Sequence, residues 1–143
     1  MDKNYEFSIE QSTSEDRDCV DDKIVGFNSI QVPFTQSEKF IRIDYVIKNN
    51  GIIIAGINSL LYCWKCLYID VLWVDDQFRH QGLGSQLLHR VEDEARNLGC
   101  KLAHLDTFDF QGKDFYLKNG YEIFGTLKDC PPGHTRYYLN KKL

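Results

Sequence analysis

The spacing of apolar residues in the middle of the chain predicts a strand, a turn and an amphipathic helix in succession. Residues 67–74 form an almost continuous apolar run, which is typical of a buried strand. After a glycine-containing turn, apolar residues recur at intervals of one, three or four, which places them on one face of a helix. They are Leu83, Leu87, Leu88, Val91, Ala95 and Leu98. Gly99 follows, where a helix is expected to end.

Similar patterns predict the other elements. Alternating or continuous apolar positions predict strands at residues 4–11, 40–47, 52–62, 101–107, 121–127 and 135–140. Helices are predicted at residues 14–31 and 112–118. Asn49-Asn50-Gly51 favours a tight hairpin between the second and third strands. The central helix joins two strands that should therefore be parallel and connected by a right-handed crossover.

The turn before the central helix is a candidate phosphate-binding cradle. A helix that begins at glycines presents free backbone N–H groups and the positive end of its dipole to an anion. Arg79 adds a permanent positive charge. Two commoner phosphate-binding loops are excluded. The chain has no Walker sequence, and Leu87 stands where a dinucleotide fingerprint has its third glycine. The expected cradle residues are Arg79, His80, Gln81, Gly82, Leu83, Gly84 and Ser85.

Two motifs in this order resemble the GNAT superfamily of acyl-CoA-dependent N-acetyltransferases. Arg79, Gly82 and Gly84 match Arg/Gln-x-x-Gly-x-Gly/Ala, and residues 115–121, Phe-Tyr-Leu-Lys-Asn-Gly-Tyr, are similar to a late motif of the family. The segments 106–111 and 131–134 are similar to a subgroup of small, uncharacterised bacterial proteins. The resemblance implies one domain over residues 1–143 with an α+β fold. Its mixed, mostly antiparallel central sheet would contain a parallel, splayed strand pair, with helices on both faces.

The resemblance also implies a donor and a mechanism. Acetyl-CoA would give its acetyl group directly to a primary amine in a ternary complex, with the cradle on the pyrophosphate of CoA. The backbone of Leu72, Trp73 and Val74 would bind the pantetheine arm and the thioester carbonyl. Tyr116, in the late motif, would be the general acid that protonates the departing thiolate.

The amine must lose a proton before it attacks, because a lysine-like amine is mostly protonated at neutral pH. Asp70 interrupts the apolar strand two residues before Leu72, so we expect it to be partly buried near the splay and to act as the base. A structural carboxylate bonded to a neighbouring strand is an equal alternative. Asp106 is the second candidate and a substrate-binding residue, while His104 and His134 are weaker candidates.

The acceptor is not specified by the sequence. We expect its pocket to include Phe34, in an aromatic loop after the first helix. An aminoglycoside, a polyamine, an amino acid or a protein amine would each fit this reading.

Composition limits the functional classes. The chain has 143 residues and a net charge of −4, so no basic surface indicates nucleic acid as a partner. No apolar run is long enough to span a membrane, and no secretory signal is evident, so a cytoplasmic protein is expected. A homodimer is possible, because many relatives are dimers.

Two other functions remain open. The first is a noncatalytic module that binds acyl-CoA without turnover. The second is a redox or zinc protein built on Cys63 and Cys66, although this C-x-x-C has no second pair at zinc-finger spacing. We expect no bound metal.

Overall fold

The computed structural model describes residues 3–143, which form two compact units that divide after Phe34. The first unit holds helix α1, Ser14–Gln31. Its start is fixed by a capping box, in which the Thr13 hydroxyl accepts from the Asp16 N–H and the Asp16 carboxylate accepts from the Thr13 N–H. The helix agrees with the predicted bounds.

The strand predicted at residues 4–11 is wrong. In the described chain these residues form no strand, and Tyr5, Phe7 and Ile9 are exposed. Apolar and polar residues do alternate in this segment. A strand also needs a neighbouring strand to bond its backbone N–H and C=O groups, and alternation alone does not provide one.

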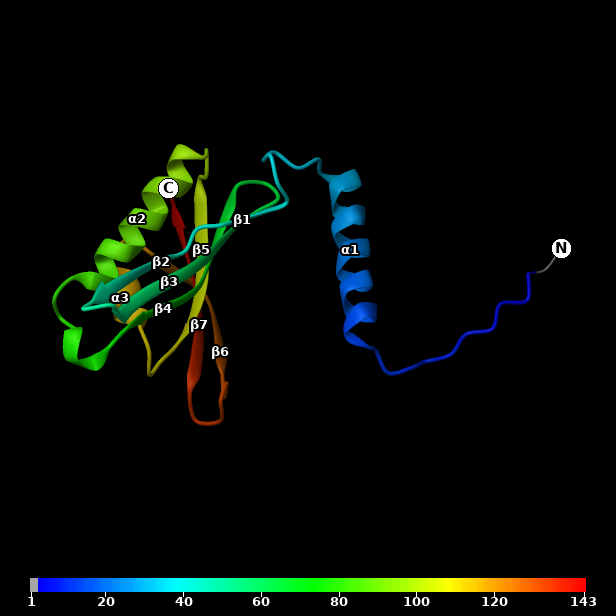
Figure 1. The fold of residues 1–143 in the computed structure, drawn as a ribbon. Helices are drawn as coiled ribbons and strands as arrows, with labels where there is room; N and C mark the ends of the chain where they lie inside the picture. The colour runs from blue at the N-terminus through cyan, green and yellow to red at the C-terminus, as the bar shows by residue number, and fades with distance from the viewer. Residues whose placement is uncertain (1–2) are drawn as a thin grey trace. The chain divides into compact units, whose positions relative to one another are not determined.

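The second unit is built on a sheet of seven strands, counted over the described residues (Figure 1). Its order is β1-β3-β4-β5-β7-β6, and β2 pairs with the same edge of β3 as β1 does. The strands are β1 (Phe40–Arg42), β2 (Tyr45–Asn49), β3 (Ile52–Tyr62), β4 (Cys66–Val74), β5 (Leu102–Phe108), β6 (Glu122–Lys128) and β7 (Thr135–Lys142). All pairs are antiparallel except β4 with β5. The predicted mixed, mostly antiparallel α+β architecture is confirmed.

The predicted strand 40–47 is divided into β1 and β2 by a side-chain interaction. The Asp44 carboxylate accepts from the backbone N–H of Ser59 at 2.8 Å. The Ser59 hydroxyl in turn donates to the carbonyl oxygen of Ile43. One backbone bond persists here, from the Ile43 N–H to the Ser59 carbonyl oxygen, but the Asp44 side chain takes the Ser59 N–H, so the regular ladder is interrupted between two short strands. The hairpin that follows is as predicted, with positive φ at Asn50 and Gly51.

Helix α2, Leu83–Asn97, crosses one face of the sheet (Figure 1). Its apolar stripe packs against β2, β3 and β4. Leu88, Val91 and Ala95 are fully buried, which confirms the helix face derived from the sequence. Helix α3, Lys113–Lys118, contributes Tyr116 to the same core. A helix on the opposite face of the sheet stays a prediction.

The parallel pairing of β4 and β5 ends partway along both strands. Their ladder joins Cys66–Ile69 to Leu102–Leu105, after which the strands diverge (Figure 1). At the same level a β-bulge shifts the register between β3 and β4, and Asp70 is the extra residue opposite no residue of β3. The expected splayed pair is therefore present, and the bulge turns β4 away from β5.

Candidate active site

A cavity of about 690 Å³ opens where β4 and β5 diverge. Its walls come from four places: the end of β4, the turn before α2, the end of β5 and helix α3. The lining includes Asp70, Val71, Leu72, Trp73, Val74, Phe78, Asp106, Thr107, Phe110, Gln111, Gly112, Phe115, Tyr116 and Lys118. The cradle residues Arg79, His80, Gly82, Leu83, Gly84 and Ser85 complete it. The structure thus brings the two sequence motifs to one cavity.

The cradle has the backbone geometry of an anion site. His80 and Gly82 both have positive φ, 62° and 78°, and Gly82 is the N-cap of α2. In the described chain no side chain caps this end of the helix, and a Cβ at Gly82 would meet no atom within 4 Å. The first N–H groups of α2 are therefore left without a side-chain acceptor at the positive end of the helix dipole, and the space beside Gly82 is open.

Gly84 serves packing within the same turn. A Cβ there would lie 3.3 Å from two ring carbons of Phe115. The missing side chain lets α2 begin close to α3, which keeps the cradle and the late motif on one cavity. Gln81, by contrast, is exposed and does not line the cavity in the described chain, so its expected role in binding has no support from its position.

Arg79 lies on the cavity wall and is also engaged in holding the turn. Its Nε donates to the carbonyl oxygen of Val74 at 3.1 Å, and its Nη2 lies 2.8 Å from the carboxylate of Asp76. Asp76 belongs to a short 3-10 helix, η1 (Asp76–Phe78), which was not predicted. Arg79 therefore fixes the turn against the end of β4 as well as adding positive charge beside the cavity.

Tyr116 is buried and lines the cavity from α3. Burial, with a smaller effect of the Asp106 charge, raises the pKa of Tyr116 to about 12. Its ring packs edge-on against Phe115 and Tyr121. The phenol is thus protonated at neutral pH and held in one position by aromatic neighbours.

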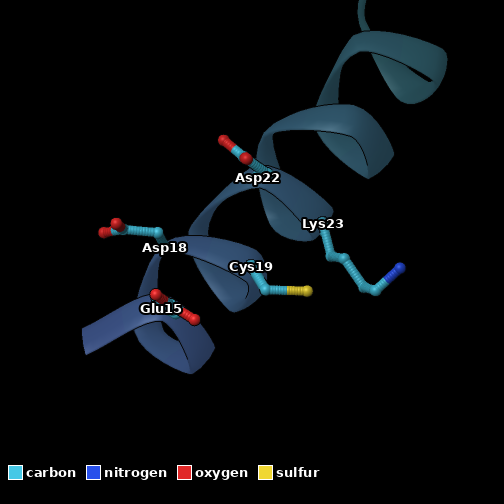
Figure 2. A pocket seen from close by; sticks show the side chains of 5 residues that line it. All are labelled: Glu15, Asp18, Cys19, Asp22 and Lys23. Atoms are coloured by element: carbon cyan, nitrogen blue, oxygen red, sulfur yellow. The ribbon is translucent and has the colours of Figure 1, made fainter. Parts of the chain in front are cut away.

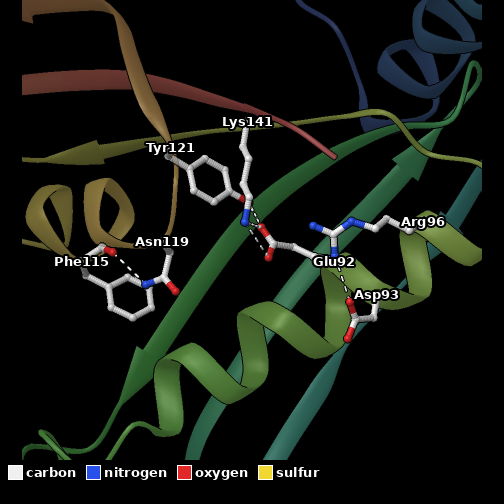
Figure 3. Close-up of polar contacts among 7 residues, drawn as sticks. All are labelled: Glu92, Asp93, Arg96, Phe115, Asn119, Tyr121 and Lys141. Atoms are coloured by element: carbon white, nitrogen blue, oxygen red, sulfur yellow. Dashed lines mark hydrogen bonds and ion pairs between the residues drawn. The ribbon is translucent and has the colours of Figure 1, made fainter.

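A buried ionic cluster of Glu92, Tyr121 and Lys141 is linked to Tyr116 through the backbone of Tyr121, which follows helix α3 (Figure 3 shows the cluster). Glu92 of α2 is fully buried, accepts from the Tyr121 hydroxyl at 2.9 Å, and lies 3.0 and 3.1 Å from Lys141 Nζ. The backbone N–H of Tyr121 donates to the carbonyl oxygen of Tyr116. Burial and the Glu92 carboxylate both raise the pKa of Tyr121. This cluster ties α2, β7 and the end of α3 together, and the sequence patterns did not reveal it.

The expected burial of Asp70 is wrong. Its side chain lies on the cavity wall but is exposed, because the bulge turns it outward from the apolar strand. The Asp70 carboxylate is therefore not desolvated, and its expected role as a base depended on desolvation. Leu72, Trp73 and Val74 line the cavity as expected, and in the described chain β4 has no ladder partner on the β5 side beyond Ile69.

Asp106 lies at the cavity with its carboxylate largely occupied. Oδ1 accepts from Arg136 Nε at 2.9 Å and from Nη2 at 2.5 Å, and Oδ2 accepts from the Tyr68 hydroxyl at 3.0 Å. Burial and this bond raise the pKa of Tyr68 to about 12. His104, two residues earlier in β5, is bonded to the Tyr62 hydroxyl at 2.7 Å. These polar groups stand on the face of the sheet opposite α2.

Several wall residues were not predicted from the sequence. Phe110, Gln111, Gly112 and Lys118 line the cavity, and the first three follow directly after β5. Phe110 and Gln111 lie in the segment 106–111, which resembled a subgroup without a known role, and Lys118 lies in the late motif. No sequence pattern indicated Gly112 as a wall residue. Phe34 is the last residue of the first unit, and its part in the acceptor pocket stays a prediction.

The cysteine pair gives no sign of a site. Burial raises the pKa of the Cys63 thiol, which is opposite to what a reactive thiolate needs. Within residues 3–143 no three His, Cys, Asp or Glu side chains are grouped to hold a metal ion. A second hollow lies on α1, lined by Glu15, Asp18, Cys19, Asp22 and Lys23. Figure 2 shows these side chains spreading outward from one exposed helix, without converging on a common point. None of the described helices could cross a membrane.

Comparison with known proteins finds acetyltransferases similar to this chain. Residues 17–123 match the family described as Acetyltransferase (GNAT) domain. A blasticidin-S acetyltransferase of Streptomyces morookaense is 43% identical over 81 residues, which cover 56% of this chain and 60% of that protein. The chain thus spans less than two thirds of that relative.

Solved structures extend the similarity over more of the chain. An acetyltransferase from Bacillus cereus superimposes with a TM-score of 0.86 and 36% identity, covering 96% of this chain and 98% of that one. A Bacillus anthracis acetyltransferase, solved in complex with acetyl coenzyme A, has a TM-score of 0.63 and 21% identity over 71% of this chain and 62% of that one, and so shares the fold.

The family match covers most of the chain and includes the cradle and the late motif, both of which line one cavity. This chain belongs to the GNAT family of acetyltransferases.

Proposed function

We propose that this protein transfers the acetyl group of acetyl-CoA directly to a primary amine. The supporting observation is the cavity, which joins the cradle to Tyr116 through the opening between β4 and β5. The pyrophosphate would lie on the N-terminus of α2, at the positive φ turn of His80 and Gly82. The pantetheine arm would run along the β4 edge that has no ladder partner.

Acetyl-CoA fits the residues present. The β4 edge offers backbone groups to an amide-containing chain in the way an added strand would. Gly82 leaves the space that the phosphates need, and no metal is required by this chemistry. When bound, acetyl-CoA supplies an activated acyl thioester.

Tyr116 would move a proton to the sulfur as the C–S bond breaks. With its pKa near 12, giving its own proton to a thiolate whose thiol titrates near 8.5 would be uphill by about 5 kcal/mol. We therefore infer that Tyr116 gives its proton to the sulfur at the same time as it receives the second proton of the attacking amine nitrogen. The phenol then stays neutral throughout. Asp70 and Asp106 border the same space and would orient the acceptor.

The first acceptor to test is blasticidin S, on the strength of the 43% identical relative. Purified protein would be given acetyl-CoA with blasticidin S, spermidine, an aminoglycoside or a lysine peptide, and release of free CoA thiol would be measured. Acetylation of at least one amine is expected. Binding of acetyl-CoA without thiol release from any amine would favour the noncatalytic binding module.

Tyr116→Phe tests the proton-transfer role. Turnover should fall about tenfold or more, because general acid catalysis is lost, while acetyl-CoA affinity measured by calorimetry stays within about twofold. Unchanged turnover would exclude Tyr116 as the acid.

A further inference from the structure

Two segments that resembled a subgroup without a known role meet beside the cavity. His134 Nδ1 lies 2.9 Å from Asp109 Oδ1, and Asp109 Oδ2 accepts from the backbone N–H of Thr135 at 2.9 Å. The backbone N–H of Asp109 also donates to the carbonyl oxygen of Thr135. The pair thus stands on a continuation of the β5–β7 ladder, which holds both residues rigidly.

The carboxylate of the pair is ionised and fixes the imidazole. The backbone N–H of Thr135, and to a smaller extent His134, hold the pKa of Asp109 below its usual range. An ionised carboxylate at Nδ1 favours the tautomer that carries the proton on Nδ1, which leaves the lone pair of Nε2 free to accept a proton. About half of the His134 side chain is exposed, so the ring can exchange protons with solvent.

The pair is joined to the cavity through Phe110. This side chain lines the cavity, and its ring packs edge-on against His134 with 5.2 Å between the ring centroids. Phe110 also stacks on Phe108, whose ring lies under the guanidinium of Arg136. His134 is not itself among the residues that line the cavity; it contacts the cavity wall through Phe110, which follows the end of β5.

The other candidates for the base are less suited. Asp106 already accepts from Arg136 and Tyr68. Asp70 is exposed, and among residues 3–143 no side chain is seen to hydrogen-bond to its carboxylate. His134 has two features of an effective base: a ring oriented by a carboxylate, and a second ring nitrogen on a side chain that is about half exposed. The charged groups near it include Asp109, which faces the ring, and Asp129, whose carboxylate accepts from the backbone N–H of the preceding Gly133. Arg136, two residues later on β7, has its guanidinium held by Asp106.

We propose that His134, positioned by Asp109, accepts the proton that the acceptor ammonium must lose before acetyl transfer. This inference rests on the proposed function. Nε2 takes one proton from R–NH₃⁺, and the freed lone pair on nitrogen attacks the thioester carbon. The C–N bond forms, the C–S bond breaks, and the second amine proton reaches the sulfur through Tyr116. His134 then releases its proton to water, so the net products are the amide, CoA thiol and one proton.

Kinetics of His134→Gln and Asp109→Asn test the proposal, with acetyl-CoA and the best amine of the panel above. His89→Gln is the control, because His89 is exposed on α2 away from the cavity. Near pH 7 both test variants should lose about 100-fold in turnover, while the control keeps the wild-type rate. As the pH approaches the pKa of the amine itself, the rates of wild type and His134→Gln should converge, because the neutral amine needs no base. A purely structural defect would persist at high pH and would overturn the proposal.

Nitrogen-15 NMR of the histidine rings gives a test that needs no acceptor. Neutral His134 should carry its proton on Nδ1, lose this preference in Asp109→Asn, and shift when acetyl-CoA is added. A proton on Nε2, or an unchanged His134 signal while Gly82 and Gly84 shift, would overturn the role of His134 and leave the proposed function standing. If acetyl-CoA shifts none of these signals, both proposals fail.

Discussion

Replacing Lys141 by methionine should strongly destabilise the protein, because it leaves a carboxylate charge in the core. Glu92 has only 1% of its side chain exposed, and Lys141 makes two of its three close polar contacts (Figure 3). Breaking a buried ion pair on one side typically costs 3–5 kcal/mol, and the 18% exposure of Lys141 admits some water, so we expect a loss of about 3 kcal/mol. For a chain of this size that corresponds to a fall in Tm of roughly 10 °C.

Denaturant unfolding followed by tryptophan fluorescence measures this loss. Lys142→Met is the matched control, because Lys142 is the exposed neighbour on the same strand and should change stability by about 0.5 kcal/mol or less. Replacing the charged pair together, as Glu92→Leu with Lys141→Met, should recover most of the loss, and adding Tyr121→Phe should recover the rest, because no polar group then stays unpaired. Equal stabilities of Lys141→Met and Lys142→Met would refute the reasoning.

Two further predictions concern acetyl-CoA binding at the cradle and the free energy of unfolding at acidic pH. Gly82→Val should weaken acetyl-CoA binding about tenfold in calorimetry, since it adds a side chain to the anion site at φ 78° and strains the turn by roughly 1–2 kcal/mol. Gly51→Val is the control, because Gly51 has the same φ and equally open space but lies outside the cavity. An equal loss of affinity in Gly51→Val would contradict a local effect. Burial lowers the pKa of His104, so the unfolded chain takes up a proton below about pH 6.5 that the folded chain resists. The free energy of unfolding should therefore fall as the pH drops below 6.5, and His104→Gln should flatten this slope in urea titrations; an unchanged slope would assign the acid sensitivity to other groups.

Local patterns predicted the elements whose stability comes from one amphipathic face. The stripe from Leu83 to Leu98 gave α2 within one residue at its C-terminal end, and Asn49-Asn50-Gly51 gave the hairpin with its positive φ values. Failures arose where a long-range partner decides the outcome. Residues 4–11 have the alternation of a strand, and the break at Asp44 depends on Ser59, fifteen residues away.

The site shows the same division between local and long-range information. The cradle and Tyr116 were predicted because each lies in a short motif. Asp70 was misplaced because periodicity cannot reveal a bulge, which shifts one residue off the strand pattern. The Asp109–His134 pair joins segments 25 residues apart, so it becomes visible only when β5 and β7 are placed side by side.

The early end of the β4–β5 ladder bears on how this protein tolerates sequence change. The edge of β4 beyond Ile69 offers main-chain groups, which are the same whichever side chains the strand carries. Substitutions at Val71 or Trp73 would therefore change side chains on the cavity wall without removing the main-chain groups proposed to hold the donor. If the proposed function holds, side chains of the wall could change to suit a different acceptor, while the backbone groups proposed to bind acetyl-CoA would stay the same.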